Sequence, residues 1–191
     1  MSETQFNTNG LIGDINDTTR KYPNLHRVLS MLIDHMIMCL VIVPLLALLF
    51  GLVAYFEDYL NKWFGISLIL LPFFIYLNKD FFKSKSPGKR ILGYQVIDRK
   101  TNNPANELQC FIRNLTICVA WPIEVIVSLI SPERRIGDFL ANTKVILAEK
   151  EKLKSFWTDL KSTTLKLNYI GIIIIGGIYF YGLSFLLFNL D

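Results

Sequence analysis

LHRVLSMLIDHMIMCLVIVPLLALLFGL, residues Leu25–Leu52, is the stretch that decides the fold. A helix of about 20 apolar residues, rising roughly 1.5 Å per residue, crosses a hydrocarbon core of about 30 Å. This stretch is longer and carries no charge from Met36 onward. Its first part contains Arg27 and Asp34, which lie close to two helical turns apart and therefore share one face. A carboxylate at that depth costs about 2.5–3.5 kcal/mol unless it is paired. The stretch therefore predicts a spanning helix whose acid needs a partner.

The composition of the whole chain also indicates a membrane protein. Of its 191 residues, 52% are hydrophobic, and the mean hydropathy is +0.38. Soluble domains lack apolar runs of this length. The cysteines are scattered and form no CxxC pair, so we interpret them as small packing residues. We expect an integral membrane protein with one domain.

Other segments extend this pattern along the chain. Residues 1–24 are polar and predict a cytoplasmic tail. Residues 149–167 place Leu, Phe and Trp at helical spacing between lysines, which predicts an amphipathic helix on the membrane surface. Two long apolar segments predict further spanning helices, the second of them within residues 168–191. These predicted spans are Phe64–Phe82 and Tyr169–Phe188.

The segment Phe111–Ile130 is apolar but is interrupted by Trp121-Pro122, and basic residues flank it on both sides. Basic loops stay in the cytoplasm. If the segment enters the membrane and returns, every Lys and Arg except Lys62 lies in the cytoplasm, together with the N-terminus. If it crosses, one basic region lies outside. We favour a re-entrant hairpin broken near Trp121-Pro122, and a full span remains the alternative.

Two short segments, Ile91–Ile97 and Thr143–Leu147, have the composition of strands. They can pair only if both lie on the same side of the membrane, which supports the hairpin. The predicted fold is an all-α membrane protein. It consists of a small transmembrane helix bundle with a re-entrant or third helical segment, a short cytoplasmic β element and an amphipathic surface helix.

Three motifs in this order resemble the RDD family of bacterial membrane proteins. They are Arg27 with Asp34, then SPGKRILG at residues 86–93, then RRIGDFLANT at residues 134–143. The resemblance covers residues 25–148, and the last span lies outside it. It implies a helical membrane fold in the bacterial cytoplasmic (inner) membrane. Transport, including ion/proton exchange, is suggested for some members.

The family is named for one arginine and two aspartates. The resemblance places them at Arg27, Asp34 and Asp138. The sequence departs from the family pattern at two positions, because Asn142 replaces a glycine and Gly137 replaces a common histidine.

Asp34 has two interpretations. In the first, it forms a buried ion pair that ties helices together. In the second, it is a proton or cation site on a transport path with His35 and Glu124. A nearby arginine keeps a carboxylate ionised and makes it a poor proton carrier, so we favour the ion pair. The candidate partners are Arg27, Arg113, Arg134 and Arg135.

Other charged residues have structural or surface interpretations. We expect Asp138 to hold Arg27 or the Lys89-Arg90 pair, and Glu124 to pair with an arginine or to line a wet cavity. Some basic and aromatic residues suit a surface for lipid phosphates or a partner. These are Lys89, Arg90, Lys154, Trp157 and Lys161.

The sequence contains no set of residues typical of a nucleophile with its base or of a metal site. We therefore expect a protein that is not an enzyme, with no cofactor and no nucleic-acid partner. The favoured function is a subunit or scaffold of a membrane assembly, whose partners are membrane lipids and other membrane subunits or further copies of itself. The alternative is an oligomeric transporter or antiporter of a small ion or solute that uses an intramembrane aspartate.

Overall fold

The computed structural model describes residues 21–56, 58–131 and 133–188. Most of the predicted tail, residues 1–20, lies outside the described residues. The described chain is mainly helical, with one small sheet, as predicted. Two of its helices are long and apolar enough to cross a membrane, namely α2 (Pro23–Tyr55) and α9 (Asn168–Phe188) through its residue Leu186.

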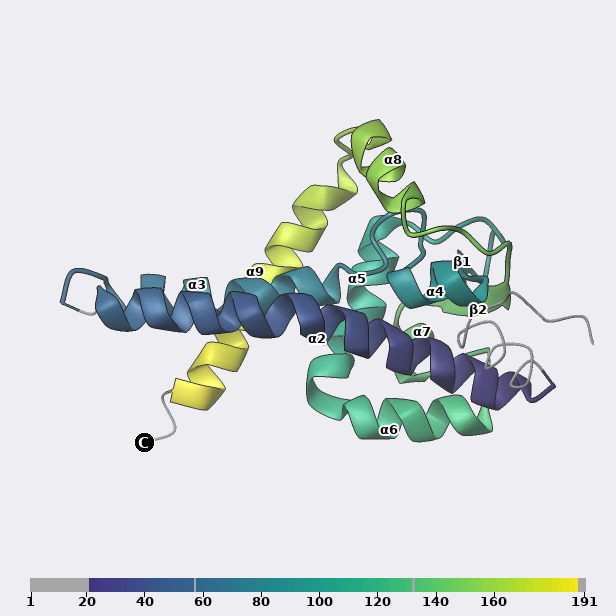
Figure 1. The fold of residues 1–191 in the computed structure, drawn as a ribbon, viewed down its shortest axis with the longest axis horizontal. Coiled ribbons are helices and arrows are strands. Elements are labelled where there is room, and N and C mark those ends of the chain that lie inside the picture. The colour runs from purple at the N-terminus through teal and green to yellow at the C-terminus, as the bar shows by residue number, and fades with distance from the viewer. Residues whose placement is uncertain (1–20, 57, 132, 189–191) are drawn as a thin grey trace, which may run out of the picture.

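The long helices form the apolar part of the molecule (Figure 1). Helix α3 (Lys62–Leu77) lies beside α2, and α9 crosses both. Pro23 opens α2 at a position where a missing N–H costs nothing, and the Asn61 side chain caps α3 by accepting from the Trp63 N–H. Many apolar side chains of these helices are exposed; Leu40 is 77% exposed and Ile178 is 68% exposed. Exposed apolar surface on this scale is typical of contact with lipid.

The predicted second span is shorter than expected. Helix α3 ends at Leu77, and turns occupy the residues up to Ser84. At 16 residues, α3 is an apolar helix below the length of an ordinary span. The Asn78, Lys79 and Asp80 side chains end the apolar run, so the helix stops before Phe81 and Phe82.

The polar elements gather around the first half of α2 (Figure 1). They are α4 (Pro87–Leu92), β1 (Tyr94–Asp98), α7 (Ile136–Leu140) and β2 (Thr143–Leu147). The predicted strand pair is confirmed: β1 and β2 are antiparallel, and Val96 lies opposite Val145. Both valines are buried in a core that includes Leu92 and Cys110. The first strand begins later than predicted, because Ile91 and Leu92 belong to α4.

Helices α5 (Glu107–Leu115) and α6 (Ile117–Ile130) occupy the interrupted apolar segment. The two parts, Glu107–Leu115 and Ala120–Ile130, are bent by 109°. Ala120 has non-helical angles (φ −131°, ψ 30°) just before Trp121-Pro122. Pro122 lacks an N–H and clashes with the preceding turn, which breaks the helix there. The break lies close to the predicted position, and a bend this large suits a re-entrant segment.

The predicted amphipathic helix over residues 149–167 is helical only in α8 (Ser155–Ser162). The hydroxyls of Ser162 and Thr163 donate to the Asp159 carbonyl oxygen. Such side-chain bonds compete with helical backbone bonds, and the chain is extended at Thr163 (ψ 125°).

Candidate functional site

Seven buried ionisable side chains follow one another through the polar part of the molecule, each within 4 Å of the next. We call them the buried ion-pair chain. Each side chain is at most 3% exposed. Helices α2, α4, α5, α6 and α7 contribute to it, together with the turns after α3 and before α7. In order, the members are Asp34, Lys89, Asp80, Arg113, Asp138, Arg135 and Glu124.

At one end, the SPGKRILG motif surrounds Asp34. Asp34 accepts from Ser86 Oγ at 2.5 Å, from the Gly88 N–H at 2.6 Å and from Lys89 Nζ at 3.3 Å. A Cβ at position 88 would lie 2.7 Å from the Ser30 carbonyl oxygen and 2.8 Å from Asp34 Oδ1, so only glycine allows this approach. The predicted arginine partner of Asp34 is therefore wrong. The SPGKRILG motif lies against Asp34 instead and supplies Lys89 as its partner.

Asp80 lies in the middle of the buried ion-pair chain. It accepts from Lys89 Nζ at 2.6 Å, from Arg113 Nη1 at 3.0 Å and from Asn114 Nδ2 at 3.1 Å. Sequence analysis misses this residue, because Asp80 falls near the end of a predicted span. A signal is nevertheless present: Lys79-Asp80 is a charged pair between two apolar aromatic runs, which is unusual unless the charges have buried partners.

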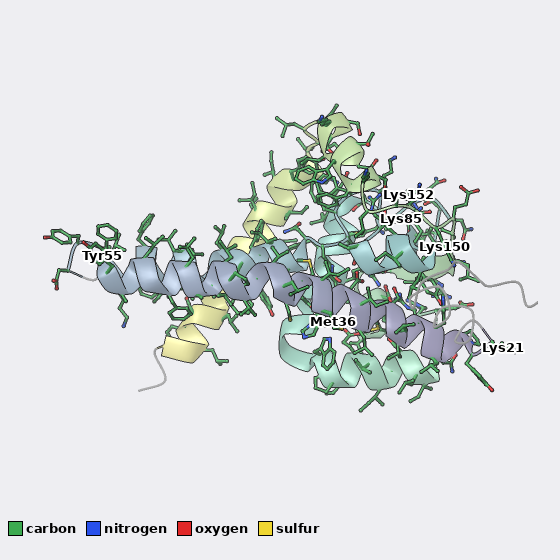
Figure 2. All side chains as sticks on the ribbon, viewed as in Figure 1. Lys21, Met36, Tyr55, Lys85, Lys150 and Lys152 are labelled. Atoms are coloured by element: carbon green, nitrogen blue, oxygen red, sulfur yellow. The ribbon has the colours of Figure 1, made fainter. Side chains whose placement is uncertain are left out.

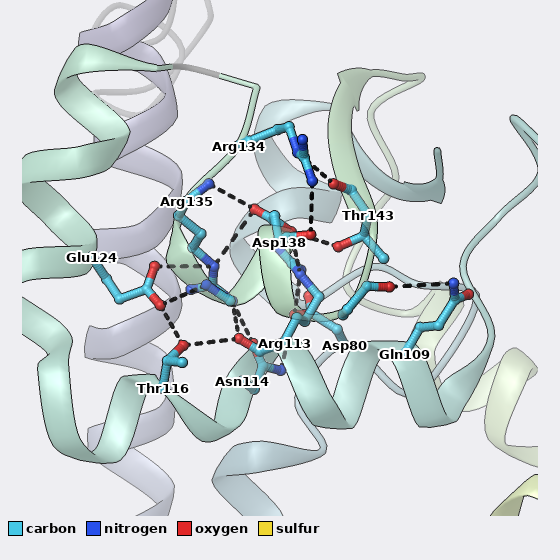
Figure 3. A network of polar contacts seen from close by, with 12 residues as sticks. Asp80, Gln109, Arg113, Asn114, Thr116, Glu124, Arg134, Arg135, Asp138 and Thr143 are labelled. Atoms are coloured by element: carbon cyan, nitrogen blue, oxygen red, sulfur yellow. Dashed lines mark hydrogen bonds and ion pairs between the residues drawn. The ribbon is translucent and has the colours of Figure 1, made fainter. Parts of the chain in front are cut away.

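Asp138, one of the three residues that name the family, holds Arg113 (Figure 3). Its Oδ1 accepts from Arg113 Nε at 2.7 Å and from Thr143 Oγ1 at 2.8 Å, and its Oδ2 accepts from the Arg135 N–H at 3.1 Å. Burial alone would raise the pKa of Asp138, but the charges of Arg113 and Arg135 hold it well below its ordinary value. The predicted pairing of Asp138 with Arg27 or with Lys89-Arg90 is wrong, because Arg113 on α5 bonds Asp138 instead.

Glu124 on α6 is the other end of the buried ion-pair chain (Figure 3). It accepts from Thr116 Oγ1 and, at 3.0 Å, from the Gly137 N–H. Its second oxygen lies 3.8 Å from Arg135 Nε. Glu124 therefore lies at ion-pair distance from an arginine, one of its two expected settings, and its hydrogen bond from the Gly137 N–H joins α6 to α7.

The two departures from the family pattern have structural explanations. A Cβ at position 137 would lie 1.9 Å from the Arg113 carbonyl oxygen, so this backbone has no room for a histidine. Asn142 has φ 53°, in the left-handed region where glycine is usual. Asparagine tolerates that region better than most residues. The family glycine is thus replaced by a residue suited to the same turn.

Arg27 lies beside the ion-pair chain. Its side chain is buried, and its guanidinium stands 5.7 Å from the centre of the Tyr94 ring. Nη1 has no hydrogen-bond partner among the described residues. Asp138 is its leading attractive electrostatic neighbour. The three family residues therefore belong to one polar region, although Arg27 makes no contact within 4 Å of a described carboxylate.

A second network fixes α8 to α4. Arg90 donates to Glu151 at 2.5 Å and to Asp159 at 2.7 Å, and Lys85 donates to Glu151 at 2.6 Å. Lys85 is buried, whereas Lys150 and Lys152, which are labelled near it in Figure 2, are exposed. Lys89 and Arg90 are buried, so their prediction as a lipid or partner surface is wrong: both are used inside the protein.

The remaining predicted residues are not members of the buried ion-pair chain, although Arg134 donates to the Asp138 carbonyl oxygen at 3.4 Å. His35 Nδ1 is 3.1 Å from the Tyr76 hydroxyl, and the His35 ring lies 5.1 Å from the Trp121 ring. Arg134 covers the Phe139 ring at 3.9 Å. Lys154, Trp157 and Lys161 are exposed on or beside α8, which leaves their lipid role a prediction.

Together, the apolar helices and the buried ion-pair chain define a helical membrane protein whose polar elements are tied to its first span. The RDD family model matches residues 23–190. The chain therefore belongs to the RDD family. The match includes α9, so the expectation that the last span lies outside the family is wrong. No curated protein and no solved structure matches the chain.

Proposed function

We propose that this RDD protein is a non-catalytic subunit or scaffold of a membrane assembly. It would lie in the bacterial cytoplasmic membrane, with its N-terminus in the cytoplasm and with further membrane subunits or copies of itself as partners. The observation that carries the proposal is the unbroken series of ion pairs among the members of the buried ion-pair chain. Asp80 and Asp138 each face two or more fixed donors, as a structural lock requires.

A structural lock explains why the members of the buried ion-pair chain are charged, and it does not require them to take part in a chemical reaction or in transport. It ties α2 to α4 through Asp34, and α5 to α7 through Arg113 and Asp138. A carboxylate held by an arginine stays ionised at ordinary pH and is a poor proton carrier. The apolar surfaces of α2 and α9 remain free for lipid or for a partner helix in the membrane.

One observation favours the alternative, an oligomeric ion or solute transporter. Asp34 is paired with a lysine at 3.3 Å and has no arginine within 4 Å among the described residues. A buried lysine can lose its proton, whereas an arginine cannot. If Lys89 moved away from Asp34 toward Asp80, the net charge around Asp34 would change.

Asp34→Asn separates the two functions. If Asp34 is part of a lock, the purified full chain melts at a lower temperature in detergent, and proteoliposomes show no cation flux driven by a pH gradient before or after the change. Asp58→Asn, at an exposed position, is the control. A stable Asp34→Asn protein that has lost a measurable flux would reject the scaffold and support the transporter.

The assembly itself is tested by mild detergent extraction of the tagged full chain. We expect either a second membrane protein in fixed proportion or a homo-oligomer by light scattering. A monodisperse monomer with neither partner in every mild detergent tried would contradict the proposal.

A further inference from the structure

An apolar pocket of about 730 Å³ lies between the spanning helices and α8. Its walls come from α2, the end of α3 and the turn after it, α4, the residues leading into α8, α8 itself and the start of α9. Arg90 of α4 is a lining residue, but its charge is balanced by Glu151 and Asp159. Val41, Phe74, Phe156 and Ile172 are among the apolar lining residues. Pockets that hold small ligands have volumes of about 300–1,000 Å³. The walls are almost wholly apolar, so the pocket suits a hydrocarbon chain.

One end of this pocket is cationic. Lys79 lines it with a side chain that is 8% exposed, and its ammonium lies 4.7 Å from the centre of the Tyr76 ring. Among the described residues, no carboxylate lies within 4 Å of Lys79 Nζ. The nearby acids Asp34 and Asp80 are already held by Lys89.

The charge count of the buried region leaves one base in surplus. Five buried bases face four buried acids in and around the ion-pair chain. The two bases Lys85 and Arg90 are balanced separately by Glu151 and Asp159. One positive charge is therefore in surplus. Arg27 and Lys79 both lack a carboxylate within 4 Å among the described residues, and of these two only Lys79 lines the pocket. The bases are Arg27, Lys79, Lys89, Arg113 and Arg135, and the acids are Asp34, Asp80, Glu124 and Asp138.

We propose that this pocket binds one anionic phospholipid, with an acyl chain between α2, α3 and α9 and its phosphate at Lys79. A buried cation without a counter-charge is costly, and a void between apolar side chains loses their contacts. An anionic lipid would supply the counter-charge through its phosphate and fill the pocket with its acyl chain. This inference goes beyond the proposed function and holds for a subunit and for a transporter alike.

Native mass spectrometry of the full chain with added phosphatidylglycerol or phosphatidylcholine tests the proposal. The wild type retains one phosphatidylglycerol, about five-fold more than phosphatidylcholine, as expected for one basic residue at the membrane surface. Lys79→Met removes this preference, and Lys79→Arg keeps it. Lys152→Met, an exposed lysine away from the pocket, is the charge control.

A second pair of variants tests the acyl chain. Val41→Trp fills the pocket and abolishes retention of either lipid, whereas Val43→Trp, also exposed on α2 but outside the pocket lining, leaves it intact. Equal retention of both lipids by the wild type, or retention unaffected by Val41→Trp, overturns the proposal. So does a retained free fatty acid, or a dimer that Val41→Trp dissociates, because the pocket would then hold a different occupant.

Discussion

Each polar residue of the buried ion-pair chain is held by more than one donor or acceptor, so single substitutions leave charges without partners. Lys89 bonds Asp34, Asp80 and Ser86 Oγ at the same time. Breaking a buried pair by removing one partner typically costs about 3–5 kcal/mol, mainly because the other charge stays buried. The residues therefore act as a unit, which pair-by-pair substitution should reveal.

A double substitution at Asp34 and Lys89 tests this coupling. Asp34→Asn and Lys89→Gln should each lower the free energy of unfolding in detergent by about 3–5 kcal/mol. The double variant should cost less than the two losses together, because the second change removes a charge that the first left alone. Additive losses within about 0.5 kcal/mol would show that the two side chains do not interact.

Gly137 provides a steric test at the same scale. A Cβ there would meet the Arg113 carbonyl oxygen at 1.9 Å, so Gly137→Ala should force the backbone apart and cost about 1–3 kcal/mol, as overpacked sites do. Gly177→Ala on α9 is the matched control, because a Cβ at that position would have no neighbour within 4 Å among the described residues. A thermal shift equal in the two variants would contradict the close approach of α7 to α5.

At the scale of elements, α8 is attached by charge as well as by apolar contact. Arg90 bonds Asp159 and Glu151, and Phe156 packs against Phe82 with ring centres 4.8 Å apart. Trp157 is 65% exposed beside these contacts. This arrangement fixes one face of α8 on the protein and leaves Trp157 exposed.

The attachment of α8 should depend on pH. Although burial raises them, the pKa values of Asp159 and Glu151 lie below their ordinary values, because Lys83, Lys85 and Arg90 bond the two carboxylates. Their contribution to stability is therefore complete above the ordinary carboxyl pKa of about 4 and is lost as the pH falls below it. The protection of the α8 amides from hydrogen exchange, measured against the intrinsic exchange rate at each pH, should fall below about pH 4, and Asp159→Asn should lower it already at pH 7. Exchange that is unchanged by Asp159→Asn would show that the Asp159 ion pairs do not hold the helix.

The membrane-surface role of Trp157 has its own test. In a chain with Trp63 and Trp121 replaced by Phe, Trp157 fluorescence should shift to the blue when vesicles are added, because the indole enters the headgroup region. Aqueous iodide should quench it less than free indole. Equal quenching would place Trp157 in water and contradict this role.

At the scale of the whole molecule, contacts join the two basic regions that flank α5 and α6. Ile97 lies opposite Lys144 in the sheet, the Arg99 N–H donates to the Asn142 carbonyl oxygen, and Lys83 pairs with Asp159. These contacts join the segments before and after the α5–α6 bend. They agree with a re-entrant segment better than with a full span.

Cysteine labelling tests that topology in intact cells. Cysteines introduced at Lys83, Arg99, Lys144 and Lys161, in a chain without native cysteines, should resist a membrane-impermeant reagent and react after the cells are opened. A cysteine at Lys62 should react from outside and is the control. Labelling of positions 144 or 161 from outside would show that α5 and α6 together cross the membrane.

The sequence by itself determined the membrane class, the first and last spans, the interrupted segment and the strand pair. Length, lack of charge and the Trp121-Pro122 pair are local properties, and local properties decide whether a segment is apolar, broken or extended. The family was likewise evident from three short motifs, and its match over residues 23–190 agrees.

Only the tertiary structure decided which charges meet. The sequence offered four arginines as partners for Asp34, and the pairing with Lys89 instead depends on Gly88, which lets α4 approach within contact of α2. The role of Asp80 could not be predicted from the sequence for the same reason, because its three donors come from residues 9 to 34 positions away. Ion pairs act over a few ångströms in space, so their partners follow from the packing of helices and not from the order of residues along the chain.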